Sequence, residues 1–127
     1  WICNQIIRLM ASRGNIIKGS RIIILGITFK ENCPDVRNTK VVDVINSLKS
    51  YGANITIFDP YAIPEEVMTE YGIISYKELP KKKFDAVVLT VAHKEFINLD
   101  FSIITNKNAV IYDVKNTIPN SIADKTL

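Results

Sequence analysis

Three basic residues lie close together, directly after a short apolar run. Lys30 and Arg37 fall in a polar stretch that follows Ile22–Leu25, and Lys40 comes just beyond it. The polar stretch leads into a helix predicted to start near Asp35–Asn38, where backbone N–H groups and the helix dipole favour an anion. We therefore predict that Lys30 and Arg37 contact a phosphorylated ligand, and we expect Lys40 to face solvent.

Two further residues are candidates for the same ligand. Phe29, beside Lys30, could stack on a base or could belong to the core. Lys115 follows the apolar run 109–114, which is predicted to be a strand. In open parallel sheets the carboxyl ends of the strands share one ligand-binding edge, so Lys115 could meet the same anion.

Cys33 and His93 are the residues that could perform nucleophilic chemistry. Cys33 lies near the cations, which would lower the pKa of a thiol. His93, the only histidine in the sequence, lies two residues beyond a predicted strand and could be a catalyst or a hydrogen-bonding loop residue. A Cys33–His93 pair is not favoured, because no third residue that would orient the imidazole can be placed.

The dinucleotide-binding motif G-x-G-x-x-G is missing after the first predicted strand, where Gly26 is the only glycine. Asp59 ends the second predicted strand, which is the usual place of a ribose-binding acid. Without the glycines, a turn-capping role before Pro60 is the favoured interpretation. We do not predict that this domain alone binds NAD in the usual way.

Apolar runs and amphipathic stretches alternate along the chain, which predicts an α/β fold. The expected architecture is a Rossmann-like open parallel sheet with helices on both faces, a three-layer αβα arrangement. The predicted strands are 21–26, 54–59, 84–91 and 109–114, with a short extended piece at 73–76. Helices are predicted over 1–13, 36–51, 65–71 and 96–105, residues 76–83 form a weak helix or loop, and the polar tail 119–127 is expected to be loose.

The composition fits one domain of a globular protein with a core. The chain has 127 residues, of which 47% are hydrophobic and 23% charged, and its net charge of +3 is too small and too scattered to imply nucleic acid. No apolar run approaches the roughly 20 residues of a membrane span. Two cysteines make neither a disulfide framework nor a zinc site, so a reducing, cytoplasmic setting is expected.

The first helix indicates that the sequence is part of a longer protein. Ile2, Ile6, Leu9 and Met10 recur at helical spacing from the first residues of a chain that lacks an initial Met. We expect residues 1–14 to end a central linking helix and residues 15–127 to form a C-terminal domain.

Several motifs together resemble a known family. In order, they are G-x-x-F-K at 26–30, P-D-x-R at 34–37, a strand ending in D-P at 59–60, LTVAHKEF at 89–96 and IYDVKN at 111–116. This pattern resembles the C-terminal UDP-binding domain of the UDP-glucose/GDP-mannose dehydrogenase family. The ENCPDVRN and VAHKEF stretches most resemble the branch acting on UDP-N-acetylhexosamines, which makes uronic acids for capsule, O-antigen or related polysaccharides.

The resemblance implies an NAD-dependent enzyme that oxidises the sugar C6 hydroxyl to a carboxylate. The complete proteins have an N-terminal NAD domain and a central helical region that forms a homodimer. By resemblance, Phe29 and Lys30 contact the UDP-sugar, and Lys115, where many relatives have Arg, helps to hold it. Arg37 is implied to reach the phosphates of NAD when the domains close.

The family's catalytic cysteine lies in a motif that this sequence does not contain, and Cys33 is not that residue. We therefore expect the isolated domain to be inactive, so NAD reduction by this chain with a UDP-sugar would contradict the interpretation. A receiver domain fits poorly, because Phe29–Lys30 stands where its acidic cluster would lie. A non-catalytic nucleotide-binding or scaffold module remains the alternative. The specific UDP-sugar, the oligomeric state and the roles of His93 and Cys33 stay open.

Overall fold

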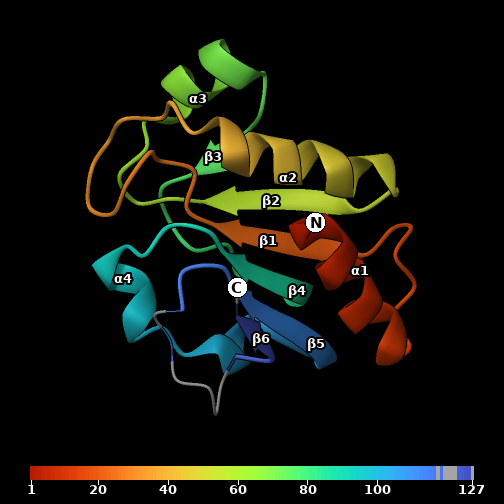
Figure 1. Cartoon of the computed structure of the whole chain (residues 1–127). Coiled ribbons are helices and arrows are strands. Elements are labelled where there is room, and N and C mark those ends of the chain that lie inside the picture. The colour runs from red at the N-terminus through yellow and green to blue at the C-terminus, as the bar shows by residue number, and fades with distance from the viewer. Residues whose placement is uncertain (117, 119–122, 127) are drawn as a thin grey trace.

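The computed structural model describes residues 1–116, 118 and 123–126, and it has a six-stranded sheet at its centre (Figure 1). The sheet order is β3-β2-β1-β4-β5-β6, and every neighbouring pair is parallel. The strands are β1 (Arg21–Leu25), β2 (Asn54–Phe58), β3 (Ser75–Tyr76), β4 (Phe84–Leu89), β5 (Thr105–Asp113) and β6 (Lys125–Thr126). The helices are α1 (Ile2–Ser12), α2 (Thr39–Ser50), α3 (Pro64–Tyr71) and α4 (Lys94–Ile97), with the 3-10 turn η1 (Phe101–Ile103).

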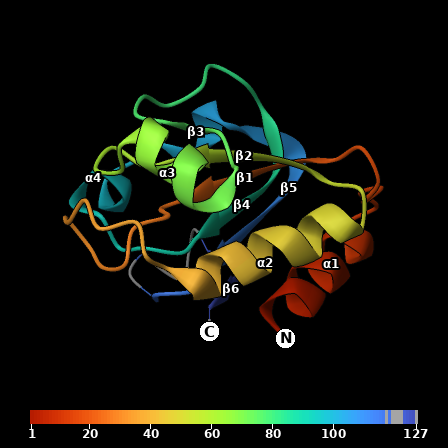
Figure 2. The same ribbon diagram turned by 90° about the horizontal axis from the view of Figure 1, so that it is seen from above.

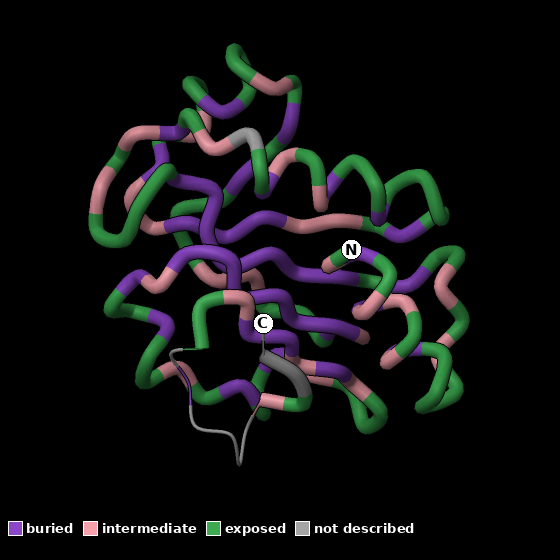
Figure 3. The backbone as a smooth tube through the Cα atoms, in the orientation of Figure 1, coloured by how far each residue is buried: buried purple, intermediate pink, exposed green. Residues whose placement is uncertain are grey.

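The central strands are apolar on both faces because both faces are covered. On one face Ile22 and Ile24 join a cluster with the buried sides of α1 and α2, which lie side by side in Figure 2. On the other face Ile23 and Leu25 pack in a cluster with Phe96 of α4 and with η1. Figure 3 shows the resulting buried centre of the sheet. The predicted three-layer αβα architecture is confirmed.

α1 is held against the sheet by apolar packing and by polar contacts. Ile6 and Met10 are completely buried in the core, and the Tyr112 hydroxyl donates to Gln5 Oε1 over 2.6 Å. Arg13 donates to the carbonyl oxygen of Ala109 and forms an ion pair with Asp124. The N-terminal helix therefore packs on the same core as the rest of the described chain.

Two predicted helices have different boundaries in the structure. The helix predicted over 96–105 is instead α4 followed by a separate 3-10 turn, because the Asp100 carboxylate accepts from Ser102 N and caps a new turn. α2 begins at Thr39 rather than near Val36, since the Asn38 side chain caps the helix.

The tail expected to be loose contains β6, which pairs with Tyr112 and Asp113 of β5. Residues 119–122 and 127 of that tail lie outside the described residues. No helix within the described ranges has the length and hydropathy needed to span a lipid bilayer.

Candidate ligand-binding site

The loop between β1 and α2, residues 26–38, is folded back on itself at the carboxyl edge of the sheet. Phe29 N donates to the carbonyl oxygen of Asp35 over 2.6 Å, and Asn38 Nδ2 donates to that of Thr28 over 2.6 Å. In Figure 1 this loop (orange) lies above α4. The strand end, the loop and the start of α2 therefore form one continuous edge, as expected for a ligand site in this fold class.

A cleft of about 370 Å³ opens at this edge, and we call it the cationic cleft. It lies between the start of α2 and the ends of β4 and β5, where Val114 N donates to the carbonyl oxygen of Leu89. Its lining residues are Ile2, Phe29, Arg37, Asn38, Lys40, Val41, Val44, Thr90, Val114 and Lys115.

The charges of the cationic cleft all have one sign. Arg37, Lys40 and Lys115 line it, and no Asp or Glu does so among the residues whose positions are described. The first turn of α2 adds the positive end of its helix dipole. Val41, Val44 and Val114 supply an apolar wall. Such a cleft favours a ligand that combines negative charge with an apolar or aromatic part.

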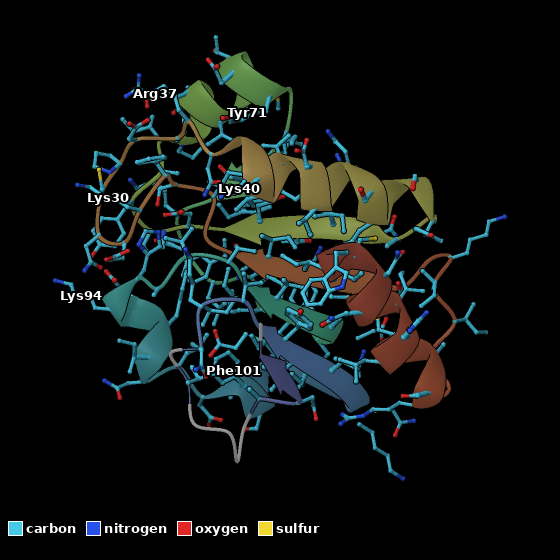
Figure 4. All side chains as sticks on the ribbon, in the orientation of Figure 1. Lys30, Arg37, Lys40, Tyr71, Lys94 and Phe101 are labelled. Carbon is cyan, nitrogen blue, oxygen red and sulfur yellow. The ribbon has the colours of Figure 1, made fainter. Side chains whose placement is uncertain are left out.

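The structure brings together three of the four residues predicted to bind a ligand. Phe29, Arg37 and Lys115 line the cleft. Phe29 is 62% exposed, so the alternative that it belongs to the core is wrong. Lys30 is exposed but does not line the cleft, and Figure 4 shows it on the outer part of the loop, away from Lys40.

Lys40 is the charged lining residue that sequence reasoning did not select as a ligand contact. It is exposed, as expected, but its side chain also borders the cleft. The Cα–Cβ bonds of a helix tilt toward its N-terminus, so a residue in the first turn of α2 projects toward the carboxyl edge of the sheet. That direction was the signal that could have identified Lys40.

Arg37 is held by a two-point contact with Asp35. Arg37 Nε donates to Asp35 Oδ1 over 2.9 Å, and Arg37 Nη2 donates to Oδ2 over 2.7 Å. These hydrogen bonds hold the pKa of the Asp35 carboxyl at about 2 and raise the pKa of the guanidinium. The remaining N–H groups of this exposed guanidinium are free to bind a phosphate.

Asp59 is completely buried and caps turns, as the favoured interpretation predicted. Its Oδ1 accepts from the amides of Tyr61 and Ala62, and its Oδ2 accepts from those of Ile27 and Thr28. Burial by itself raises the pKa of Asp59, but the hydrogen bonds, above all that from His93, outweigh burial and lower it. With its side chain enclosed, Asp59 has no access to a ribose.

His93 is a buried hydrogen-bonding residue with contacts at both ring nitrogens. Nε2 lies 3.0 Å from Asp59 Oδ2 and 3.1 Å from Thr28 Oγ1, and Nδ1 accepts from Asn32 N. Neither nitrogen remains available as a base for Cys33. Among the residues that the structure describes, no group of His, Cys, Asp or Glu side chains is arranged to hold a metal ion.

The fold and the cationic edge define a Rossmann-like nucleotide-binding class of domain. The model of the UDP-glucose/GDP-mannose dehydrogenase family, UDP binding domain, matches residues 23–120. The chain belongs to this family.

Known relatives resemble the whole chain but are much longer. A UDP-N-acetyl-D-glucosamine 6-dehydrogenase of Salmonella typhi is 38% identical and aligns with 100% of this chain, which spans 31% of that protein. Protein CapL of Staphylococcus aureus is 36% identical, with 93% of this chain and 28% of that protein covered. A solved NDP-N-acetyl-D-galactosaminuronic acid dehydrogenase from Methanosarcina mazei Go1 superposes with a TM-score of 0.76 at 23% identity, covering 92% of this chain and 26% of that one. The last similarity supports the fold alone.

Proposed function

We propose that the chain is the UDP-sugar-binding domain of an NAD-dependent nucleotide-sugar 6-dehydrogenase and that UDP occupies the cationic cleft. The observation that carries this proposal is the pair of lysines, Lys40 and Lys115, that line the cleft where no described Asp or Glu does so, next to the exposed ring of Phe29. A diphosphate needs cations that are not already neutralised, and a base needs an aromatic or apolar surface.

Each residue has a distinct role in this proposal. Lys40 and Lys115 hold the diphosphate from opposite walls as point charges, and Phe29 stacks on the base or ribose. Lys30, on the outer part of the loop, contacts the sugar end of the substrate. Arg37, oriented by Asp35, offers its open edge to the phosphates of NAD, which is held mainly by a separate N-terminal domain in this family. NAD supplies the hydride acceptor, and the residues described here bind and orient the substrate.

The same proposal covers the protein's context. Residues 1–14 end a central linking helix, residues 15–127 form the UDP-binding domain, and the full-length protein is a homodimer through its central region. The proposed reaction converts a UDP-N-acetylhexosamine or UDP-glucose to the uronic acid in the cytoplasm, for capsule, O-antigen or a related polysaccharide. The similarity to the Salmonella typhi dehydrogenase and to CapL supports this assignment.

Calorimetric titration of the chain with UDP tests the proposal. We expect Lys40→Ala and Lys115→Ala each to weaken binding about tenfold, equivalent to ~1.4 kcal/mol. Lys30→Ala should weaken a UDP-sugar more than UDP, and Arg37→Ala should leave UDP binding nearly unchanged. Lys49→Ala, which removes an exposed lysine from the last turn of α2, is the matched control.

Equal binding by the Lys40, Lys115 and Lys49 variants would place UDP outside the cationic cleft. If the wild-type chain binds no UDP, the titration is repeated on a chain that also carries the family's N-terminal and central regions. Binding there would show that the cleft needs those regions, and its absence would contradict the proposal.

A further inference from the structure

Phe29, Lys30 and Glu31 form a short arch in the β1–α2 loop. The residues that flank the arch on its two sides both contact the buried imidazole of His93. Thr28 is the residue before the arch, and its Oγ1 lies 3.1 Å from His93 Nε2. Asn32 is the residue after it, and its backbone N–H donates to His93 Nδ1 over 2.8 Å. His93 is 61 residues away from Asn32 in sequence and is 0% exposed.

The hydrogen-bonding partners determine the tautomer of His93. A backbone N–H can only donate, so Nδ1 must carry a lone pair and the proton lies on Nε2. The Thr28 hydroxyl donates to the carbonyl oxygen of Lys30 over 3.0 Å, so it accepts from the imidazole. The Nε2 proton is therefore shared between Thr28 Oγ1 and Asp59 Oδ2.

The end of the arch at Asn32 depends most directly on His93. Asn32 has φ 56°, a left-handed conformation that is uncommon outside glycine and that Asn adopts more readily than most residues. Its backbone N–H is bonded to His93, and its Oδ1 accepts from Lys94 N over 3.0 Å. The Thr28 end has independent support, because the Thr28 amide also donates to Asp59.

The ring is fixed by packing on two sides. The Tyr61 ring lies 4.6 Å from the imidazole centroid, and the Phe96 ring lies 5.3 Å from it. An enclosed ring with all its hydrogen-bonding atoms engaged provides a rigid support for a loop.

We propose that His93 is a positioning residue that holds the Phe29–Glu31 arch in its ligand-binding shape through Nδ1 and Asn32. The ligand part of this inference rests on the proposed function, because it assigns Phe29 and Lys30 to the UDP-sugar. His93 does not touch the ligand itself, and it acts by placing the two residues that do.

Two amide variants separate the two ring nitrogens. In His93→Asn, the side-chain oxygen takes the place of Nδ1 and keeps the bond to Asn32, while the donor to Asp59 is lost. In His93→Gln, the longer amide reaches the Nε2 position and donates to Asp59, while Asn32 loses its acceptor. Ile104→Ala, at the opposite end of the sheet from the loop, is the control for a general loss of stability.

Hydrogen exchange at Asn32 and UDP-sugar affinity are measured on each variant. In His93→Gln the Asn32 amide should lose protection from exchange and UDP-sugar affinity should fall about tenfold, the scale of one lost hydrogen bond. In His93→Asn the exchange protection of the Asn32 amide and the UDP-sugar affinity should both stay nearer to the wild-type values, even if the melting temperature is lower. The Ile104→Ala variant should retain wild-type affinity at temperatures where it is folded.

Equal Asn32 protection in the two His93 variants would overturn the proposal, as would unchanged affinity in His93→Gln. If the wild-type chain binds no UDP-sugar even when it also carries the family's N-terminal and central regions, that result would instead contradict the proposed function. In that case the exchange comparison alone decides whether His93 holds the arch.

Discussion

Asp59 makes the stability of this domain sensitive to acid. Its lowered pKa means that the folded state binds the Asp59 proton less readily than the unfolded chain does. This contribution to stability is complete above the unfolded carboxyl pKa of about 4, and it is lost as the pH falls through the lower folded pKa. We therefore expect the melting temperature to fall steeply below about pH 4.

Asp59→Asn is the variant that isolates this contribution. It should lower the free energy of unfolding at pH 7 by about 2–4 kcal/mol, because an amide cannot accept from all the donors around Asp59. Its melting temperature should also change less than that of the wild type between pH 5 and pH 3. Asp43→Asn, which removes an exposed carboxylate from α2, controls for net charge. If the melting temperatures of Asp59→Asn and the wild type fall in parallel with pH, Asp59 is not the source of the acid sensitivity.

Individual site residues were predictable from sequence where they lie beyond the carboxyl end of a predicted strand. Phe29 and Arg37 lie in the β1–α2 loop, and Lys115 lies just past the end of β5, so the rule for carboxyl edges of parallel sheets was sufficient to bring them together. The support of the loop by His93 was not predictable, because it joins residues about 60 positions apart through a tautomer that only the folded environment selects.

The connection from β1 to α2 depends on a glycine that leaves no room for a side chain. Gly26 has φ +104°, and a Cβ added there would lie 2.6 Å from the Cβ of Val91. Gly26→Ala should therefore destabilise the domain by about 2–5 kcal/mol through backbone strain and overpacking. The Gly14→Ala control has a similar φ of +82° but an open surrounding, and it should cost about 1 kcal/mol.

Chemical denaturation of the two glycine variants measures the difference. If Gly26→Ala lowers the free energy of unfolding no more than Gly14→Ala does, Val91 moves aside easily. Because the same turn starts the ligand loop, we also expect Gly26→Ala to weaken UDP binding where the variant is folded.

Secondary structure was predictable where local pattern and tertiary packing agree. The apolar runs of β1 and β4 are short and buried on both faces, so hydrophobicity alone identified them. The stretch 96–105 has apolar residues at helical spacing, yet the Asp100 cap divides it into two short turns. β6 has no apolar pattern of its own, and its pairing with the end of β5 is a tertiary contact that sequence periodicity does not report.

The core of the described chain includes a helix, α1, that lies before the residues matched by the family model. The family model begins at residue 23, whereas α1 precedes it and buries Cys3, Ile6 and Met10 against the sheet and α2. If residues 1–14 end a linking helix, as we propose, that helix is also part of the core of this domain. Motion of a linking helix would then be transmitted directly to the cationic cleft, which Ile2 helps to line.

Ile6→Ala tests whether α1 unfolds together with the sheet. Removing this completely buried side chain should cost about 2–5 kcal/mol, and unfolding should remain a single transition by circular dichroism and by calorimetry. Arg8→Ala, on the exposed side of the same helix, should change stability by less than about 0.5 kcal/mol. A separate early transition in Ile6→Ala, with the main transition unmoved, would show that α1 is an independent element. It would also remove the physical basis for coupling between a linking helix and the ligand site.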